Sequence, residues 1–309
     1  MSDDLNETKE IIETYSGFIA IVGKPNVGKS TLLNNLLGVK VAPISSKPQT
    51  TRTGIRGIYT QDNKQLVFID TPGFHKAHDA LGDFMNRQVR NNLEGIDATL
   101  WLVDLRRPPN DEDRSVARLL KKINNDVPIY LIANKVEVAK YPEEALELYQ
   151  DLFKADRTYV MSALNDVKAV YALRDDLLKI APKNPFFFPD NIRSDQSREN
   201  WAGEIVRESA MAHLRQELPY AIAVVVDEWR DPKNKNEPIY IHAEIWVERI
   251  NHRRMVIGRG GKMIKEIGRM ARKQLETLLA AKVYLDMEVV VHKDWREDMN
   301  ALIELGYAG

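Results

Sequence analysis

Residues 23–30 read Gly-Lys-Pro-Asn-Val-Gly-Lys-Ser and lie between an apolar stretch, Phe18–Val22, and a stretch of helical character, Thr31–Leu37. The spacing Gly-x4-Gly-Lys-Ser predicts a phosphate-binding loop between a buried strand and a helix. In such a loop the glycines let backbone N–H groups point at phosphate oxygens, and the helix N-terminus adds a favourable dipole. The lysine reaches the β- and γ-phosphates, and the serine hydroxyl can ligate Mg²⁺. The pattern therefore indicates nucleoside triphosphate binding by Gly23, Lys24, Pro25, Asn26, Val27, Gly28, Lys29, Ser30 and Thr31.

The composition is that of a folded protein with balanced charge. The 309 residues include 44 Lys and Arg, 45 Asp and Glu, and no cysteine. The length favours two domains, and the lack of cysteine excludes disulfides, zinc fingers and thiol catalysis. The first 13 residues are polar and acidic, so we expect no secretion signal. No stretch approaches the roughly 20 apolar residues that span a bilayer.

From Gly17 to Ala181 the pattern alternates apolar strands with helical stretches. This alternation predicts an α/β P-loop domain, with a mostly parallel six-stranded sheet and helices on both faces. A short turn at Asp62-Asn63 predicts one antiparallel hairpin. The expected strands are 18–22, 54–61, 64–70, 98–104, 127–133 and 158–162, and the expected helices are 30–37, 80–93, 111–124, 143–154 and 167–180.

A proline-rich stretch, residues 181–190, follows this first part. Its prolines break any helix, and its three phenylalanines need a surface against which to bury. We interpret it as an ordered linker; the alternative is a loop inside one domain. Beyond it the pattern predicts a compact α+β unit with strands at 221–229, 239–250 and 283–292, a helix at 262–280 and a final helix. The expected division is a flexible N-terminal segment, 1–16, a nucleotide-binding domain, 17–181, the linker, 182–195, and a second domain, 196–309.

The tetrapeptide Asp70-Thr71-Pro72-Gly73 follows a predicted strand. An acid at the end of the strand beside a phosphate loop can hold Mg²⁺ through a water molecule, and the glycine N–H can approach the γ-phosphate. Loss of the γ-phosphate would then release the segment after Gly73. The tetrapeptide also forms ordinary turns, but its position after a phosphate loop favours a nucleotide-sensing role.

Two further loops follow predicted strands and are suited to binding a base. In the loop Asn134-Lys135-Val136-Glu137 the amide can bond the base, the lysine stem can pack over its ring, and the carboxylate can accept from two base N–H groups. Guanine offers that pair of donors and adenine does not. In the second loop, Ser162-Ala163-Leu164, a backbone N–H can reach the guanine O6. Together they favour guanine recognition.

Residues 45–53 read Ser-Ser-Lys-Pro-Gln-Thr-Thr-Arg-Thr and are polar without periodicity. A loop at this position would cover the phosphates, and Thr50 or Thr51 would ligate Mg²⁺; we take Thr51 as the candidate. The alternative is a solvated loop with no role. The expected catalytic set is Lys29, Thr51, Asp70 and Gly73, and the expected Mg²⁺ ligands are Ser30, Thr51 and, through water, Asp70.

These motifs, in this order, are typical of translation-factor-class G proteins, and they closely resemble the Era family of bacterial GTPases. The resemblance rests on residues 23–31, on Lys47-Pro-Gln-Thr-Thr-Arg52 and on Asp70-Thr-Pro-Gly73. It continues through Phe188-Pro-Asp190, Asp195-Gln196, 202–208 and 217–220, and so covers nearly the entire chain. It implies a Mg²⁺-dependent GTPase that binds GTP and GDP, small-subunit ribosomal RNA near its 3′ end and the immature 30S subunit. It also implies a cytoplasmic location with peripheral contact to the inner face of the cell membrane. We expect a monomer.

Three positions bear on how such an enzyme would work. Phe74 follows Gly73 where signalling G proteins have a glutamine that orients the attacking water, and the Era family also lacks that glutamine. In related cation-dependent G proteins the residue matching Asn26 helps to hold K⁺, which we carry over as a hypothesis. The family ends its base-reading motif in Asp, whereas this chain has Glu137. The additional methylene moves the carboxylate, so we expect guanine preference with reduced affinity or selectivity.

The second domain contains Gly258-Arg259-Gly260-Gly261 between two helical stretches. A Gly-x-x-Gly loop between a preceding strand and a following amphipathic helix resembles the KH module, which clamps about four nucleotides of single-stranded RNA. The order helix-strand-strand-helix-helix-strand fits the type II arrangement. Residues 249–282 carry ten Lys and Arg against two Glu, which favours phosphate binding; the alternative is a solvated helix face. The expected RNA-binding residues are Ile257, Gly258, Arg259, Gly260, Gly261, Lys262 and Lys265, whereas Trp246 and Tyr284 are expected to pack in the core or at a sheet edge.

Two other functions are compatible with these residues. Glu137 leaves open an ATP-driven RNA remodeller, which would bind adenine as well as guanine. Phe74 leaves open an RNA-binding module in which the nucleotide is only a structural ligand, which would show no turnover even with K⁺ and RNA present. Nucleotide competition and turnover measurements separate these alternatives from a GTPase.

Overall fold

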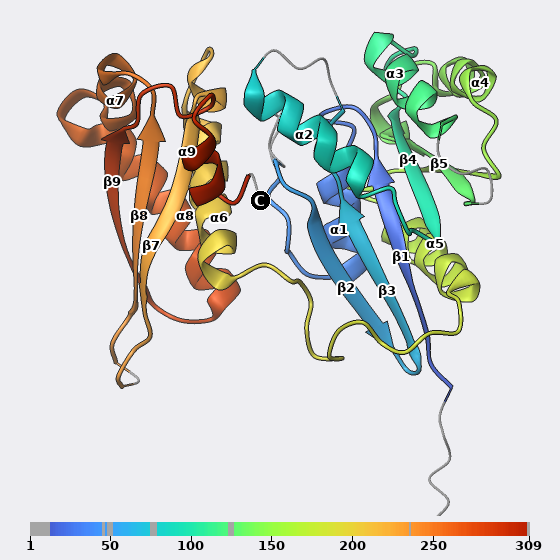
Figure 1. Cartoon of the computed structure of the whole chain (residues 1–309), viewed down its shortest axis with the longest axis horizontal. Helices are drawn as coiled ribbons and strands as arrows, with labels where there is room; N and C mark the ends of the chain where they lie inside the picture. Colours follow the sequence, from blue (N-terminus) through green and yellow to red (C-terminus); the bar gives the residue numbers. More distant parts are fainter. Residues whose placement is uncertain are drawn as a thin grey trace, which may run out of the picture.

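The computed structural model describes residues 13–44, 47, 52–74, 79–122, 127–234 and 236–307. These residues form a six-stranded sheet with its helices and a three-stranded sheet with its own helices, side by side in Figure 1. No helix in these residues has the length and apolar character needed to span a membrane.

The six-stranded sheet has the order β2-β3-β1-β4-β5-β6. β2 runs antiparallel to β3, and the other neighbours pair in parallel. This confirms the mostly parallel sheet and the single hairpin predicted from the sequence. The strands are β1 (Tyr15–Val22), β2 (Ile55–Gln61), β3 (Lys64–Asp70), β4 (Ala98–Asp104), β5 (Ile129–Asn134) and β6 (Arg157–Met161).

Helices cover both faces of this sheet because successive strand residues point to opposite sides. In β1, Ile19 and Ile21 enter the core beneath α1 and α5, whereas Ala20 and Val22 enter the core beneath α2, α3 and α4. The helices are α1 (Lys29–Leu37), α2 (Ala80–Asn91), α3 (Asp111–Leu120), α4 (Pro142–Leu152) and α5 (Val167–Ile180). α3 ends four residues earlier than predicted, and residues 123 and 124 lie outside the described residues.

The proline-rich stretch lies against the six-stranded part of the molecule, as expected of an ordered linker. The Gln65 side chain accepts hydrogen bonds from the backbone N–H groups of Phe187 and Phe188 and donates to the Phe188 carbonyl. The Phe187 ring lies 4.5 Å from that of Phe18. Phe187 nevertheless remains 44% exposed, so the expectation that all three phenylalanines bury is wrong; backbone hydrogen bonds, rather than complete burial, hold this segment.

The three-stranded sheet has the order β7-β8-β9, in which β7 (Ile222–Arg230) is antiparallel and β9 (Val283–Val291) is parallel to β8 (Ile239–Val247). Helices α6 (Arg198–His213), α7 (Ile250–Ile257) and α8 (Lys262–Leu279) pack on one face of this sheet, and a short α9 (Met299–Glu304) lies near the C-terminus. Figure 1 shows the long α6 and α8 together beside these strands. The order helix-strand-strand-helix-helix-strand confirms the KH arrangement.

The strand predicted at 239–250 ends at Val247 instead. Val247 pairs with Ile222, the first residue of β7, and with Val291, the last residue of β9. Beyond this point neither neighbouring strand offers a partner, and the chain turns through Arg249 into α7. Strand ends depend on partners that are distant in the sequence, which a local apolar pattern does not reveal.

Candidate functional site

The phosphate-binding loop has the backbone conformation that its glycines permit. It leaves β1 at Val22 and enters α1 at Lys29, with positive φ values of 155° at Gly23, 63° at Asn26 and 108° at Gly28. A side chain at Gly23 would place its Cβ 2.5 Å from the Leu102 carbonyl oxygen. The loop therefore has a conformation that presents the start of α1 to an anion.

Lys29 lies buried inside this loop. Its ammonium group donates to the carbonyl oxygens of Gly23, at 3.1 Å, and Lys24, at 3.0 Å. Burial lowers the pKa of Lys29 to about 8, because desolvation disfavours the charged form more than Asp70 and Glu112 favour it. A phosphate group in the loop would restore the favourable charge interaction.

Ser30 and Asp70 meet at the carboxyl ends of neighbouring strands. The Ser30 hydroxyl donates to Asp70 Oδ2 over 2.6 Å, and Asp70, the last residue of β3, is fully buried. Hydroxyl and carboxylate oxygens are the ligand types that Mg²⁺ prefers. The pair is thus chemically suited to a Mg²⁺ site next to the phosphates.

The segment after Asp70 folds back onto the phosphate-binding loop. Thr71 Oγ1 donates to the Ile21 carbonyl at 2.8 Å, and the Phe74 N–H donates to the Gly23 carbonyl at 3.3 Å. A Cβ at Gly73 would lie 2.8 Å from the backbone nitrogen of Pro25. The Phe74 ring packs against the core beneath α2, α3 and α4. The structure thus brings Asp70, Thr71, Pro72 and Gly73 beside the loop, whereas Thr50 and Thr51 lie outside the described residues.

The base-reading segments meet through Asn134. Its amide nitrogen donates to the Val27 carbonyl at 2.7 Å, and its Oδ1 accepts from the Ala163 N–H at 2.8 Å. Asn134 therefore joins the phosphate-binding loop, the end of β5 and the loop after β6. Asn134 and Ala163, which the sequence separates by 29 positions, are thus in direct contact.

The other two polar members of this motif differ in their surroundings. The Lys135 ammonium donates to the Asn26 carbonyl at 2.5 Å and to Asp104 at 3.0 Å. Burial alone would raise the pKa of Asp104, but hydrogen bonds from Arg106 and Lys135 hold it below its usual range. Glu137, in the short turn after Lys135, is exposed. Its carboxylate is therefore accessible from solvent.

A buried ion pair that the sequence did not predict joins the phosphate-binding loop to helix α3. Lys24 contacts Asp113 of α3 at 2.5 Å, and the Asp113 side chain is fully buried. The Tyr149 hydroxyl donates to the same carboxylate at 3.3 Å, and burial together with Asp113 raises the pKa of Tyr149. Asp113 also closes the capping box of α3 with Asn110. An acid at the third position of a helix signals a cap but does not reveal a partner 89 residues away.

The Gly-x-x-Gly loop lies between α7 and α8, with its charged side chains exposed. Gly258, Gly260 and Gly261 have φ values of 72°, 61° and 73°. Arg259, Lys262 and Lys265 are exposed, whereas Ile257 is half-buried. The structure thus presents three cations and a glycine backbone on one surface, which suits an RNA backbone.

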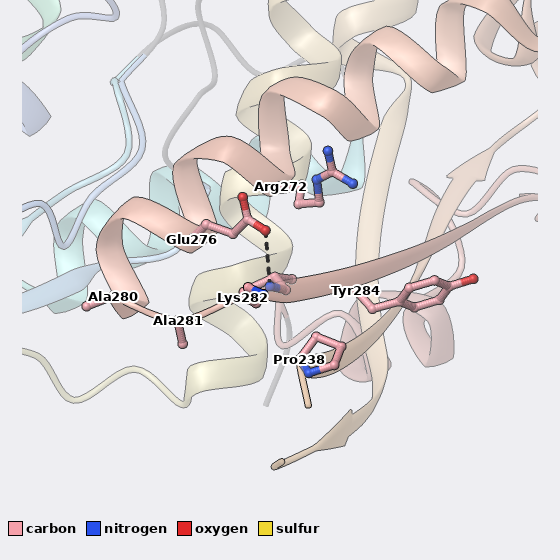
Figure 2. Close-up of a pocket in the computed structure, with 8 residues that line it drawn as sticks. Pro238, Arg272, Glu276, Ala280, Ala281, Lys282 and Tyr284 are labelled. Carbon is pink, nitrogen blue, oxygen red and sulfur yellow. Dashed lines mark hydrogen bonds between the residues drawn. The ribbon is translucent and has the colours of Figure 1, made fainter. Parts of the chain in front are cut away.

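Two cavities continue this surface along α8 and β9, and sequence reasoning did not identify them. The first, of about 410 Å³, is lined by Ile264, Lys265, Gly268, Arg269, Arg272, Leu285 and Met287. The second, of about 690 Å³, shares Arg272 and is shown in Figure 2. It also includes Lys282 and Tyr284.

Tyr284 packs at the sheet edge, one of the two placements expected from the sequence. It lies on the edge strand β9, stacks on Tyr240 with 5.8 Å between the ring centroids, and remains 58% exposed. Trp246, by contrast, is buried as predicted. The excess of basic residues between 249 and 282 was the sequence signal that could have indicated the two cavities along α8 and β9.

The fold and these loops define a P-loop GTP-binding domain joined to a KH domain. Residues 18–135 match the family described as 50S ribosome-binding GTPase, and residues 217–296 match the KH domain. GTPase Era of Deinococcus radiodurans is 55% identical over 300 residues, which cover 95% of each chain. GTPase Era of Deinococcus deserti is 52% identical over 308 residues, which cover 98% of this chain and 99% of that protein.

A solved structure agrees with these relatives. A crystal structure of Era in complex with MgGDPNP and nucleotides 1506–1542 of 16S ribosomal RNA has a TM-score of 0.88 and 35% identity, and the match covers 96% of this chain and 100% of that one. The chain belongs to the Era family of GTPases. The predicted family, fold class and GTP hydrolase activity are therefore confirmed.

Proposed function

We propose that this GTPase binds Mg²⁺-GTP beside β1 and β3, binds single-stranded small-subunit ribosomal RNA on its KH domain, and uses hydrolysis to time its release from the immature 30S subunit. The observation that carries the proposal is the presence on one chain of a phosphate-binding loop and an exposed Gly-x-x-Gly loop. Beside the second loop lies the cavity lined by Lys265, Arg269 and Arg272, which we call the basic groove. The solved relative contains both MgGDPNP and 16S ribosomal RNA nucleotides, which supports the same pair of ligands here. The proposed domain boundaries are 17–181 and 196–309, joined by 182–195.

The proposed metal site uses oxygen ligands at the start of α1 and the end of β3. Ser30 would ligate Mg²⁺ directly, Asp70 would hold it through water, and Thr51 would complete the set. When bound, Mg²⁺ neutralises charge on the β- and γ-phosphate oxygens. The 2.6 Å contact between Ser30 and Asp70 supports this assignment, and Lys29 supplies a further charge to the same phosphates.

Water orientation is proposed to depend on backbone groups and on a bound cation rather than on residue 74. Phe74 carries no hydrogen-bonding side-chain group, and its ring packs into the core. The Gly73 N–H is the proposed γ-phosphate contact, and Asn26 is the proposed K⁺ ligand. Turnover that rises when K⁺ replaces Na⁺ would support the assignment of Asn26.

Guanine recognition is proposed to use Asn134, Lys135 and Glu137 with the backbone of residues 162–164. Asn134 already holds the Ala163 N–H in place. Glu137 is exposed and can reorient, which supports retained guanine preference. An imperfect hydrogen bond costs about 1–2 kcal/mol, so we expect guanine affinity below that of a chain with aspartate at this position.

The decisive experiment is binding of labelled GDP, with Mg²⁺ and K⁺, competed by unlabelled GDP and by ADP. We expect strong competition by GDP alone, and Glu137→Asp should tighten GDP binding by about tenfold, the equivalent of about 1.4 kcal/mol. Equal competition by ADP would instead favour an ATP-driven RNA remodeller. Binding of GDP without turnover of GTP, even with K⁺ and RNA, would favour a structural nucleotide. Glu144→Asp provides the matched control, because it makes the same change to an exposed carboxylate in the first turn of α4.

A further inference from the structure

Arg52 lies three residues before β2 and is buried against the KH domain. It is 2% exposed. Its two terminal nitrogens donate to the carbonyl oxygens of Ile222, at 2.8 Å, and Tyr220, at 3.1 Å. The guanidinium carbon lies 5.4 Å from the Trp295 ring and 5.7 Å from the Tyr307 ring. All four partners belong to the C-terminal part of the chain.

A buried guanidinium requires compensation for the water that it loses. Two carbonyl dipoles and two aromatic faces provide that compensation here. The Arg52 Nε has no hydrogen-bond partner among the described residues, so the hydrogen bonds to the Ile222 and Tyr220 carbonyls come from the two terminal nitrogens. These contacts therefore fix the backbone at Arg52 against the KH domain.

The strand pairing links this position to the nucleotide site. Ile55, the first residue of β2, pairs directly with Asp70, the last residue of β3. The Asp70 carboxylate in turn contacts Ser30 of the phosphate-binding loop. The backbone that Arg52 secures is therefore continuous with the strand pair that carries the proposed Mg²⁺-binding carboxylate.

Helix α2, which follows the nucleotide-sensing segment, reaches the same KH surface. Leu81 and Phe84 of α2 share one buried cluster with Trp295 and Tyr307. Asp79, which caps the N-terminus of α2, forms an ion pair with Arg296 at 3.3 Å. The segment before β2 and helix α2 therefore both contact residues in the range 295–307.

We infer that Arg52 is a positioning residue for GTP hydrolysis, whose guanidinium holds the start of β2, and through it Asp70, against the KH domain. The inference rests on the role proposed above for Asp70. Arg52 does not touch the nucleotide; it acts through the Ile55–Asp70 pair. Hydrolysis by the first domain then depends on an intact contact with Trp295 and Tyr307 of the second.

The test compares Arg52→Met and Arg52→Lys with Arg56→Met in the full-length protein. Arg56 lies in β2, four residues after Arg52, but its guanidinium forms an exposed pair with Asp195, so it controls for loss of a cation near β2. We expect kcat for GTP to fall about tenfold in Arg52→Met, within the range that small misplacements produce. We expect a smaller fall in Arg52→Lys and no change in Arg56→Met. KM for GTP and affinity for GDP should change less than twofold, because the loop that binds the phosphates is untouched.

A double-mutant cycle separates positioning from general destabilisation. Arg52→Met and Trp295→Leu should be strongly non-additive in kcat, because both break one contact. Additive effects, or an unchanged kcat in folded Arg52→Met protein, would overturn the inference. If Arg52→Met does not fold, the cycle is run with Arg52→Lys and the same criteria apply. Wild-type protein that fails to hydrolyse GTP would contradict the proposed function instead, so the two failures are distinguishable.

Discussion

The protonation of the buried Lys29 side chain links the stability of the fold to the proposed binding of phosphate. Its ammonium group is enclosed by the loop and bonded to two carbonyl oxygens. Burial lowers the pKa of Lys29 from 10.5 to about 8. Between these two values the unfolded chain binds more protons than the folded chain, so this group makes stability rise with pH from about 8 to about 10.5.

Nucleotide binding should reverse this shift. The phosphates of GDP favour the charged lysine and raise its pKa. We therefore expect GDP binding at pH 8 to take up about half a proton, since Lys29 is then about half protonated before binding. Calorimetry in two buffers of different ionisation enthalpy measures this uptake. Lys29→Met should abolish it, whereas the exposed Lys154→Met should retain it; equal uptake in both variants would contradict the assignment.

At the scale of elements, both functional loops depend on backbone conformations that favour glycine. In the Gly-x-x-Gly loop the glycines differ in what surrounds them. A Cβ at Gly258 would lie 2.6 Å from Met263 Cβ and 2.9 Å from its backbone nitrogen, whereas a Cβ at Gly260 would have no atom within 4 Å. Gly258 is therefore constrained both by its positive φ and by contact with Met263, whereas Gly260 is constrained by its positive φ alone.

This difference predicts unequal effects of the same substitution. Gly258→Ala should lower the free energy of unfolding by about 2–3 kcal/mol, because backbone strain and a steric clash add. Gly260→Ala should lower it by about 1 kcal/mol, the cost of the left-handed conformation. Urea unfolding of the two variants measures both values. Equal losses would mean that the contact with Met263 relaxes without cost.

The ends of elements are where sequence reasoning was least accurate. The prediction for β8 was three residues too long because residues 248–250 lie beyond the ends of both partner strands. This error concerns neighbours supplied by other parts of the chain.

At the scale of the whole molecule, the proposed nucleotide-binding and RNA-binding surfaces lie beside different sheets. The phosphate-binding loop follows β1, and the basic groove lies between α8 and β9. Figure 1 shows the two sheets in separate halves of the molecule. Charge changes in the Gly-x-x-Gly loop should therefore act on RNA without acting on nucleotide.

The corresponding variant is Arg259→Glu with Lys262→Glu, tested on RNA spanning nucleotides 1506–1542 of 16S ribosomal RNA. We expect RNA affinity to fall more than tenfold and the salt dependence of log K to weaken by about two charge contacts. GDP affinity should stay unchanged. Lys121→Glu with Lys122→Glu is the matched control, because these exposed lysines follow α3 in the other half of the molecule. Equal loss of RNA and GDP binding would contradict the proposed division into domains.

The sequence by itself determined the phosphate-binding loop, the Asp-Thr-Pro-Gly turn, the base-reading motif, the Gly-x-x-Gly loop and the order of elements around them. These features are local, because each depends on the backbone conformations of a few consecutive residues. The tertiary structure alone decided that Lys24 pairs with Asp113, 89 residues away, and that Arg52 bonds Ile222, 170 residues away. The physical reason is that a buried charge requires a partner, and the local sequence around that charge does not identify the distant segment that supplies it.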